Sequence, residues 1–324
     1  NNDRKIIFKF PKFLIYFYIL LNGFKYKYIY ISTPHEYPDY PRDIKQNLFF
    51  IYEFILNYLI IKIYKNKIIL QLRGLHRYFP EINIKIKKPS IYSYFRSFYL
   101  DECKYIVCES FFLKKTLIKK LGFLKSKNKK IYVNYYAYSK KKEEVNFKYK
   151  KNLNIGILGA VDPVRKNYNQ LISLIKNKYF NKRAITLTFL GSVKTKNAKE
   201  KVKQISKYCK KIIHKEYLTD EELYNYGSNC DFLLSLNSKN NFYGKYRMSG
   251  CFGDAIILKK PLFCPDFEDP YREFSGFTFY FNSDKEILKK IKIHSNNRQL
   301  IKFDTLNLRA NLLKFKKDLH DPAF

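Results

Sequence analysis

Several signals that would assign this chain to a common class are missing from its sequence. Neither G-x-x-x-x-G-K-[ST] nor G-x-G-x-x-G occurs, which excludes a P-loop and a dinucleotide-binding fingerprint. No CxxC pair and no metal-ligand spacing is present, so we expect no metal site. The cysteines lie mostly in apolar runs such as "YIVCES", which predicts buried thiols in a reducing compartment. They are Cys103, Cys108, Cys209, Cys230, Cys251 and Cys264.

No uninterrupted apolar run is long enough to cross a bilayer, which takes about 20 residues. "FLIYFYILL" has nine residues, and "NLFFIYEFILNYLIIKIY" is interrupted by Glu53, two Asn and Lys62. We interpret both as domain helices. Their Lys and aromatic content leaves open that one of them docks on a membrane surface. No basic-apolar-cleavage pattern of a signal peptide is visible. The expected location is therefore cytoplasmic, with peripheral association with the cytoplasmic membrane face open.

Acidic residues are scarce relative to basic ones. The chain of 324 residues has 28 Asp and Glu against 63 Lys and Arg, which gives a net charge of +35. Such a field attracts nucleic acid, anionic membranes or phosphorylated ligands. AT-rich codons explain a high Lys count equally well. No helix-turn-helix, zinc or RNP-like signature occurs, so nucleic acid is the less favoured partner.

Strand and helix patterns alternate on both sides of a charged run at 139–152. This alternation predicts parallel sheets with helices on both faces. With 139–152 as the linker, we predict one domain at 1–145 and a second domain with C-terminal helices at 146–324. The first strand of the N-terminal domain is not visible. Within the second domain, Thr219 and Glu222 have the spacing of a capping box.

The stretch "NIGILGAVDPVRKNYNQLI" predicts a buried strand, a turn of small residues and a helix. Gly159 and Ala160 allow a ligand to approach the backbone. Arg165, Lys166 and Asn167 lie where the helix begins, and helix N-termini favour anions. The pattern suits a diphosphate, although a plain turn with surface Arg and Lys is the alternative.

A second stretch, 237–263, also predicts a loop that leads into the start of a helix. A loop rich in Asn, Gly and Ser begins at Asn237 and runs into a helix at Ser249 and Gly250. The Gly250 backbone can donate to phosphate or sugar oxygens. The Asp254 carboxylate can accept hydrogen bonds from ribose hydroxyls, although complementing the helix dipole is a sufficient alternative.

These two stretches, together with "CKYIVCESFFLKKTLIKKLGFLKSKNKKIYVNYYA", resemble the GT-B glycosyltransferases, most closely glycosyltransferase family 4. The resemblance covers roughly residues 25–265. It implies two Rossmann-like domains facing a cleft. The implied reaction moves a sugar from a UDP- or GDP-sugar to a glycan, lipid or protein acceptor, with retention of configuration. The nucleotide-sugar is a co-substrate, and neither a metal nor a further cofactor is implied.

The resemblance assigns roles to individual donor-side residues. Arg165 and Lys166 would hold the diphosphate and stabilise the leaving group, and Asp254 would bind the ribose. Two positions depart from the family pattern: Tyr246 stands where a first carboxylate is usual, and Ala160 stands where Arg is usual. These departures favour a second hypothesis, in which the fold serves a catalytically degenerate binding subunit. A basic nucleic-acid-binding protein is a third.

The acceptor side is expected at "LRGLH", where Arg73, Gly74 and His76 follow a strand, and at Glu109, which ends another strand. His76 is a candidate base or sugar contact, with a loop histidine as the alternative. His35 is more readily a loop histidine.

Overall fold

The computed structural model describes residues 12–32, 44–79, 91–135, 143–146, 152–177, 184–239, 242–296 and 300–303. The chain forms two compact units. Unit 1 comprises 1–109 and 113–133, and unit 2 comprises 110–112 and 134–324. Unit 1 therefore ends at residue 133, whereas the charge pattern places the boundary at 145.

Unit 1 contains a parallel sheet in the order β1-β2-β3-β4. Its strands are β1 (Ile29–Ser32), β2 (Ile68–Leu72), β3 (Tyr105–Cys108) and β4 (Lys130–Val133). Its helices are α1 (Lys12–Asn22), η1 (Gly23–Lys25), α2 (Ile44–Tyr64), η2 (Leu75–Arg77), α4 (Ile91–Glu102) and α5 (Phe111–Lys127), whose first two residues belong to unit 2. Every residue of β2 and β3 is buried, as expected for parallel strands covered on both faces.

The apolar stretches at 13–21 and 47–64 form α1 and most of α2, as predicted. Among the described residues, no helix combines the length and the apolar character needed to cross a membrane.

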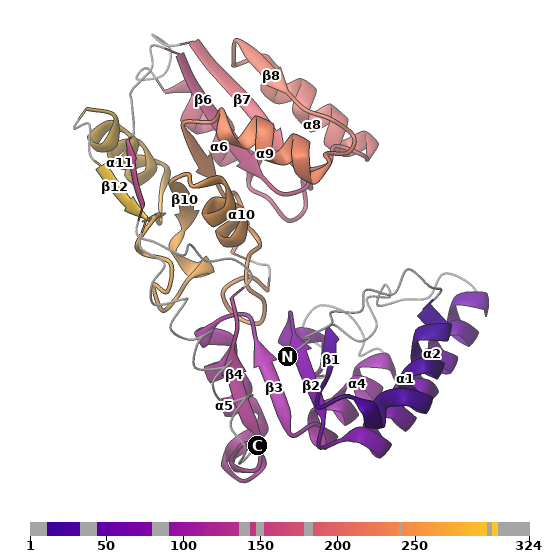
Figure 1. The fold of residues 1–324 in the computed structure, drawn as a ribbon. Coiled ribbons are helices and arrows are strands. Elements are labelled where there is room, and N and C mark those ends of the chain that lie inside the picture. The colour runs from indigo at the N-terminus through magenta and orange to yellow at the C-terminus, as the bar shows by residue number, and fades with distance from the viewer. Residues whose placement is uncertain are drawn as a thin grey trace. The chain divides into compact units, whose positions relative to one another are not determined.

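Unit 2 contains a parallel sheet in the order β11-β10-β9-β6-β7-β8 (Figure 1). The strands are β6 (Asn152–Leu158), β7 (Ala184–Leu190), β8 (Lys211–Ile213), β9 (Phe232–Leu234), β10 (Leu262–Pro265) and β11 (Thr278–Phe281). The helices are α6 (Tyr168–Lys176), α8 (Lys196–Ser206), α9 (Asp220–Ser228), α10 (Cys251–Leu258), η3 (Asp266–Glu268) and α11 (Asp284–Asn296).

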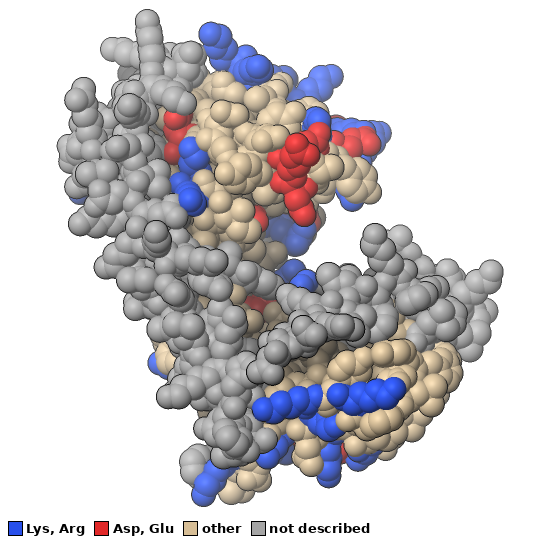
Figure 2. Space-filling model, viewed as in Figure 1, with Lys and Arg blue, Asp and Glu red and all other residues tan. Residues whose placement is uncertain are grey.

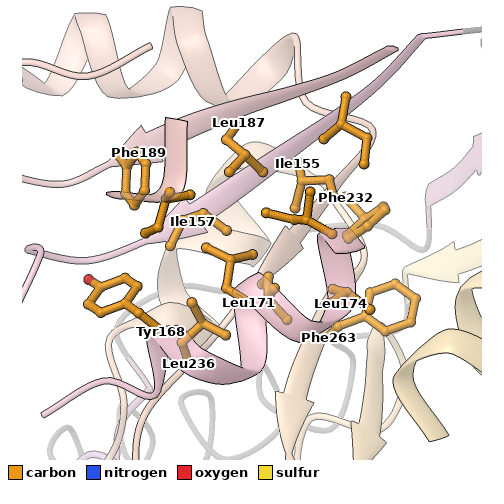
Figure 3. Close-up of a cluster of buried hydrophobic side chains, with 14 of the residues drawn as sticks. Ile155, Ile157, Tyr168, Leu171, Leu174, Leu187, Phe189, Phe232, Leu236 and Phe263 are labelled. Carbon is orange, nitrogen blue, oxygen red and sulfur yellow. The ribbon is translucent and has the colours of Figure 1, made fainter. Parts of the chain in front are cut away.

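The core of unit 2 fixes where α6 begins. Tyr168, Leu171 and Leu174 recur at helical spacing and are buried against the strands of the sheet (Figure 3). Ile157 of β6 and Leu187 of β7 point into the same cluster. Because α6 is held by this packing, the turn that joins it to β6 is held at both ends.

Most predicted elements are present, and three differ from the sequence-based expectation. The predicted linker contains β5 (Glu143–Asn146), which pairs antiparallel with β12 (Leu300–Phe303). The C-terminal tail was expected to be helical, but β12 follows α11. Gly122, with φ 75°, interrupts the helix where the sequence predicts an end, but a second helical segment follows the kink and extends α5 to Lys127. Strands β5 and β12 pair across more than 150 residues of sequence, so no local pattern reveals them.

Two local predictions are confirmed. Thr219 and Glu222 form a capping box at the start of α9, with reciprocal side-chain to backbone hydrogen bonds. All six cysteines are free thiols, and all except Cys209 are buried.

Candidate functional site

The strand order of unit 2 reverses between β6 and β9. From β6 the chain builds outward through β7 to β8, and from β9 it builds the other way through β10 to β11. Both strands are parallel, so the loops that leave their carboxyl ends lie side by side. In open α/β sheets this switch point is where ligands bind. The two stretches singled out from the sequence are the segments that follow these two strands.

The turn after β6 is packed against the end of β7. Gly159 has φ 74°, a conformation that favours glycine. A Cβ on Gly191 would lie 2.2 Å from the carbonyl carbon of Gly159. Gly159 N donates to Leu190 O at 3.1 Å, and Val161 N donates to Ser192 O at 2.9 Å. Gly191 is therefore part of the turn's support, although the sequence pattern did not indicate it.

Lys166 points into the protein. Its side chain is buried, and Nζ donates to the carbonyl oxygens of Leu158 and, at 2.9 Å, Gly159. Burial lowers the pKa of the Lys166 ammonium, and the nearby Glu268 carboxylate and Cys251 thiol oppose that effect. The ammonium thus holds the end of β6 and the start of the turn. Its predicted role as a diphosphate ligand remains a prediction.

Arg165, the neighbouring residue, has 43% of its side chain exposed. Its Nε donates to Asp162 Oδ2 at 2.6 Å, and its guanidinium also interacts with the Tyr243 hydroxyl. Arg247 also approaches Tyr243, with its guanidinium carbon 5.7 Å from the ring centroid. Arg247 was not predicted as a site residue. It brings a second cation to the loops at the switch point.

The two loops are joined by backbone hydrogen bonds. Asn167 N donates to Leu236 O at 2.8 Å, and Ser238 N donates to Arg165 O at 2.9 Å. The Asn167 side chain accepts from Gln170 N at 3.2 Å and so caps α6. This predicted donor-binding residue therefore has a structural task, and its ligand role stays untested.

A buried polar network lies beneath the second loop. The Glu268 carboxylate is fully buried and accepts from Ser235 Oγ at 2.6 Å and from Asn237 Nδ2 at 2.9 Å. Asn237 Nδ2 also lies 3.3 Å from Ser249 Oγ. Burial raises the pKa of Glu268, while the hydrogen bonds from Ser235, Asn237 and Ser249 lower it. Asn237 and Ser249, predicted as donor-binding residues, are thus buried and position the loop, and their role in donor binding remains a prediction.

Helix α10 begins where this network ends. Gly250 is exposed, and a Cβ there would meet nothing within 4 Å. Cys251 N lies 3.4 Å from Ser249 Oγ. Asp254 is in the first turn of α10, as predicted. Burial raises the pKa of the Asp254 carboxyl to about 6, and the Lys166 ammonium acts in the opposite direction. Lys166 therefore links Asp254 to the β6 turn electrostatically.

Tyr246, the residue at the missing carboxylate position, lies in a tight turn at 242–247. Its backbone N–H donates to Phe242 O at 2.8 Å. Gly244 has φ 69° and packs so closely on Phe267 O that a Cβ would overlap it. The turn is thereby held against the segment that carries Glu268. Glu268 itself was missed because nothing around "CPDFEDP" signals a buried carboxylate.

In unit 1, the predicted acceptor-side residues follow two neighbouring strands. β2 and β3 pair with Leu72 opposite Cys108, so Arg73 and Glu109 come next to each other. Arg73 Nε lies 3.5 Å from Glu109 Oε1. Gly74 precedes η2, which contains His76, and both His76 and Glu109 are buried. His35 lies outside the described residues. Within the described part of the chain, no group of three His, Cys, Asp or Glu could hold a metal ion.

No model of a protein family matches the sequence, and no curated protein matches it. Solved structures do match the fold. A glycosyltransferase from Rickettsia africae is similar with a TM-score of 0.53 at 15% identity, over 98% of this chain and 84% of the other. The fold is GT-B.

Two further solved structures are similar to the chain. A Listeria monocytogenes protein described as a UDP-N-acetylglucosamine 2-epimerase has a TM-score of 0.51 at 10% identity, over 97% and 82% of the chains. An S. aureus TarM variant in complex with fondaparinux, α-GlcNAc-glycerol and UDP has a TM-score of 0.51 at 12% identity. The chain aligns over 82% of its length with TarM but spans about half of TarM's own length, 54%.

Proposed function

We propose that unit 2 binds the diphosphate of a nucleotide-sugar and that the chain transfers the sugar to an acceptor hydroxyl. The observation that carries this proposal is the switch point between β6 and β9. There, the glycine turn at Gly159 and the N-terminus of α10 at Gly250 flank the carboxyl ends of the two strands. The solved glycosyltransferase and epimerase folds support the choice of a nucleotide-sugar as the ligand.

Each part of the site has a role in this proposal. The backbone N–H groups at the start of α10 and the Arg165 guanidinium bind the diphosphate, and Asp254 accepts from the ribose hydroxyls. During transfer, the bond between the sugar's anomeric carbon and the diphosphate oxygen breaks, and a bond to the acceptor oxygen forms. The diphosphate leaves with the electron pair and accepts the proton that the acceptor hydroxyl loses. Preplaced positive groups stabilise the charge that develops there, which is why we propose a reaction that needs no metal.

Lys166 and Glu268 act in this proposal as positioning residues. Lys166 fixes the carbonyls of Leu158 and Gly159, and Glu268 fixes Asn237. Retention of configuration is carried over from the resemblance to glycosyltransferase family 4. On the acceptor side, we propose that Glu109 and His76 of unit 1 contact the acceptor, with Arg73 orienting Glu109.

Ligand binding tests the proposal first. Thermal unfolding of the full chain is measured with UDP, GDP and their sugars, with EDTA present. A nucleotide at about 100 times its dissociation constant stabilises by about 2.7 kcal/mol. We expect one nucleotide to stabilise the wild type, and Arg165→Ala to reduce that shift strongly. Lys207→Ala is the matched control, because it removes an exposed cation elsewhere in unit 2.

The other outcomes separate the alternatives. Stabilisation by a nucleotide-sugar without transfer to any acceptor would favour a degenerate binding subunit, which the Tyr246 substitution motivates. Conversion of UDP-N-acetylglucosamine to an epimer would favour an epimerase. Stabilisation by duplex DNA alone, with a steep loss as salt rises, would overturn the proposal in favour of nucleic-acid binding.

A further inference from the structure

The outward face of α2 in unit 1 carries apolar side chains. Ile51, Ile55, Leu59 and Ile63 follow each other at four-residue spacing, so they line one face of the helix over more than three turns. Their exposed fractions are 51%, 50%, 41% and 60%. The exposed face of a helix in a globular domain is ordinarily polar.

Two polar residues of α2, Glu53 and Asn57, lie on the inward face instead. Glu53 and Asn57 are each only 1% exposed, and Asn57 Nδ2 donates to Glu53 O at 2.8 Å. The usual amphipathic pattern is therefore partly inverted in α2: the helix buries a carboxylate and an amide, and it exposes four large aliphatic side chains. Burying such polar groups costs free energy, so α2 does not follow the pattern that best shields its apolar residues from water.

Helix α1 packs against α2 and extends the apolar surface. The Tyr64 hydroxyl donates to Leu20 O at 2.7 Å and ties the two helices together. On α1, Phe17 and Leu21 are 46% and 71% exposed. We call the six residues Phe17, Leu21, Ile51, Ile55, Leu59 and Ile63 the α1–α2 face.

The charges of the segments that carry this face are almost all positive, although Glu102 of α4 pairs with Lys62 of α2 at 2.8 Å. The segments 12–32 and 44–79 contain nine Lys and Arg and a single acidic residue, the buried Glu53. Lys25, Lys27 and Lys65 are exposed. In Figure 2, the region where Figure 1 places α1, α2 and α4 is mostly uncharged, with basic side chains across it and very little red.

We propose that the α1–α2 face docks on a membrane surface that contains anionic lipid. Exposed aliphatic side chains would enter the boundary between headgroups and acyl chains, and the lysines around them would contact lipid phosphates. A second copy of the chain fits less well, because a twofold contact would bring the lysines of both copies together. Anionic lipid neutralises them. The proposal is independent of the diphosphate site, which belongs to unit 2.

Vesicle cosedimentation of the full chain tests the proposal. The probes are vesicles of phosphatidylcholine with phosphatidylglycerol and vesicles of phosphatidylcholine alone. We expect binding to the anionic vesicles. Ile51→Ser/Ile55→Ser/Ile63→Ser should weaken it at least about tenfold. Lys25→Gln/Lys27→Gln/Lys65→Gln should weaken it by roughly a hundredfold at low salt.

Matched controls separate a docking face from diffuse attraction by the positive chain. Leu124→Ser/Val164→Ser/Ile257→Ser removes three other exposed apolar residues, at 81%, 88% and 54% exposure. Lys203→Gln/Lys207→Gln/Lys210→Gln removes the same charge from unit 2. Both control variants should keep wild-type binding.

Three results would overturn the proposal. In the first, the anionic vesicles are not bound. In the second, the lysine control weakens binding as much as the Lys25, Lys27 and Lys65 variant, while the isoleucine variant binds normally. In the third, light scattering shows a dimer that the isoleucine variant makes monomeric, and the chain binds no vesicles. The third result would assign the face to a second copy. Thermal unfolding of each variant in buffer establishes that it is folded.

Discussion

The Lys166 ammonium donates to the carbonyl oxygen of Gly159 at 2.9 Å, and so a buried cation closes the turn at the proposed diphosphate site. Its neighbour Arg165 keeps 43% of its side chain exposed. The side chains of these two adjacent basic residues thus differ in placement: Lys166 supports the turn from inside the protein, and Arg165 remains at the surface.

Loss of the Lys166 charge should destabilise unit 2. We expect Lys166→Met to cost about 3 kcal/mol, because two carbonyls lose a charged donor and the buried Glu268 loses a nearby cation. In the double variant Lys166→Met/Glu268→Gln, the loss of stability should be smaller than the sum of the losses in the two single variants by about 0.5–3 kcal/mol. Urea unfolding of the four proteins measures this coupling. Additive effects would show that the two charges do not interact.

Gly191→Ala should disturb the diphosphate site without changing any group that contacts the ligand. Its Cβ would overlap the Gly159 backbone, so the β6 turn must move. We expect a loss of about 1–3 kcal/mol in stability together with weaker nucleotide binding in calorimetry.

A stability-matched variant makes the Gly191 result interpretable. Thr219→Ala removes the capping box of α9 and should cost about 1 kcal/mol. Nucleotide affinity should stay at the wild-type value in Thr219→Ala. Equal weakening in both variants would mean that affinity follows overall stability and not the position of the turn.

Asp254 should make unit 2 less stable as the pH rises. Its pKa in the folded chain is about 6, above the usual 3.8 of an aspartate, so the neutral form is favoured by folding. That contribution is present at low pH and is lost as the pH rises through about 6. Asp254→Asn should therefore unfold at a higher temperature than the wild type at neutral pH, and the difference should shrink toward pH 4. A difference that does not depend on pH would contradict the burial of this carboxylate.

The same residue should have the opposite effect on binding. An ionised carboxylate is the better acceptor for ribose hydroxyls. Affinity for a UDP-sugar should thus rise with pH through about 6 in the wild type and remain flat in Asp254→Asn. The diphosphate of a UDP-sugar is a diester and does not itself titrate in this range, so calorimetry at several pH values reports on Asp254.

Part of the candidate site was accessible from the sequence. The residues Gly159, Arg165, Gly250 and Asp254 were found because each belongs to a local pattern, a strand followed by a small-residue turn or the start of a helix. Which polar side chains are buried was not accessible. Asn237 and Ser249 were predicted to bind the donor, and the structure places both in the network around Glu268.

By itself, the sequence determined most of the order of strands and helices, the presence of two parallel sheets with helices and the turns after β6 and β9. Those features depend on periodicity, capping and small residues, which act over a few neighbouring positions. Only the tertiary structure decided that Lys166 and Glu268 point inward, that β5 pairs with β12, and that α2 buries Glu53 while it exposes Ile55. The β5–β12 pairing and the Glu268 hydrogen bonds join residues far apart in the chain, and all of these features follow from how the helices and strands pack.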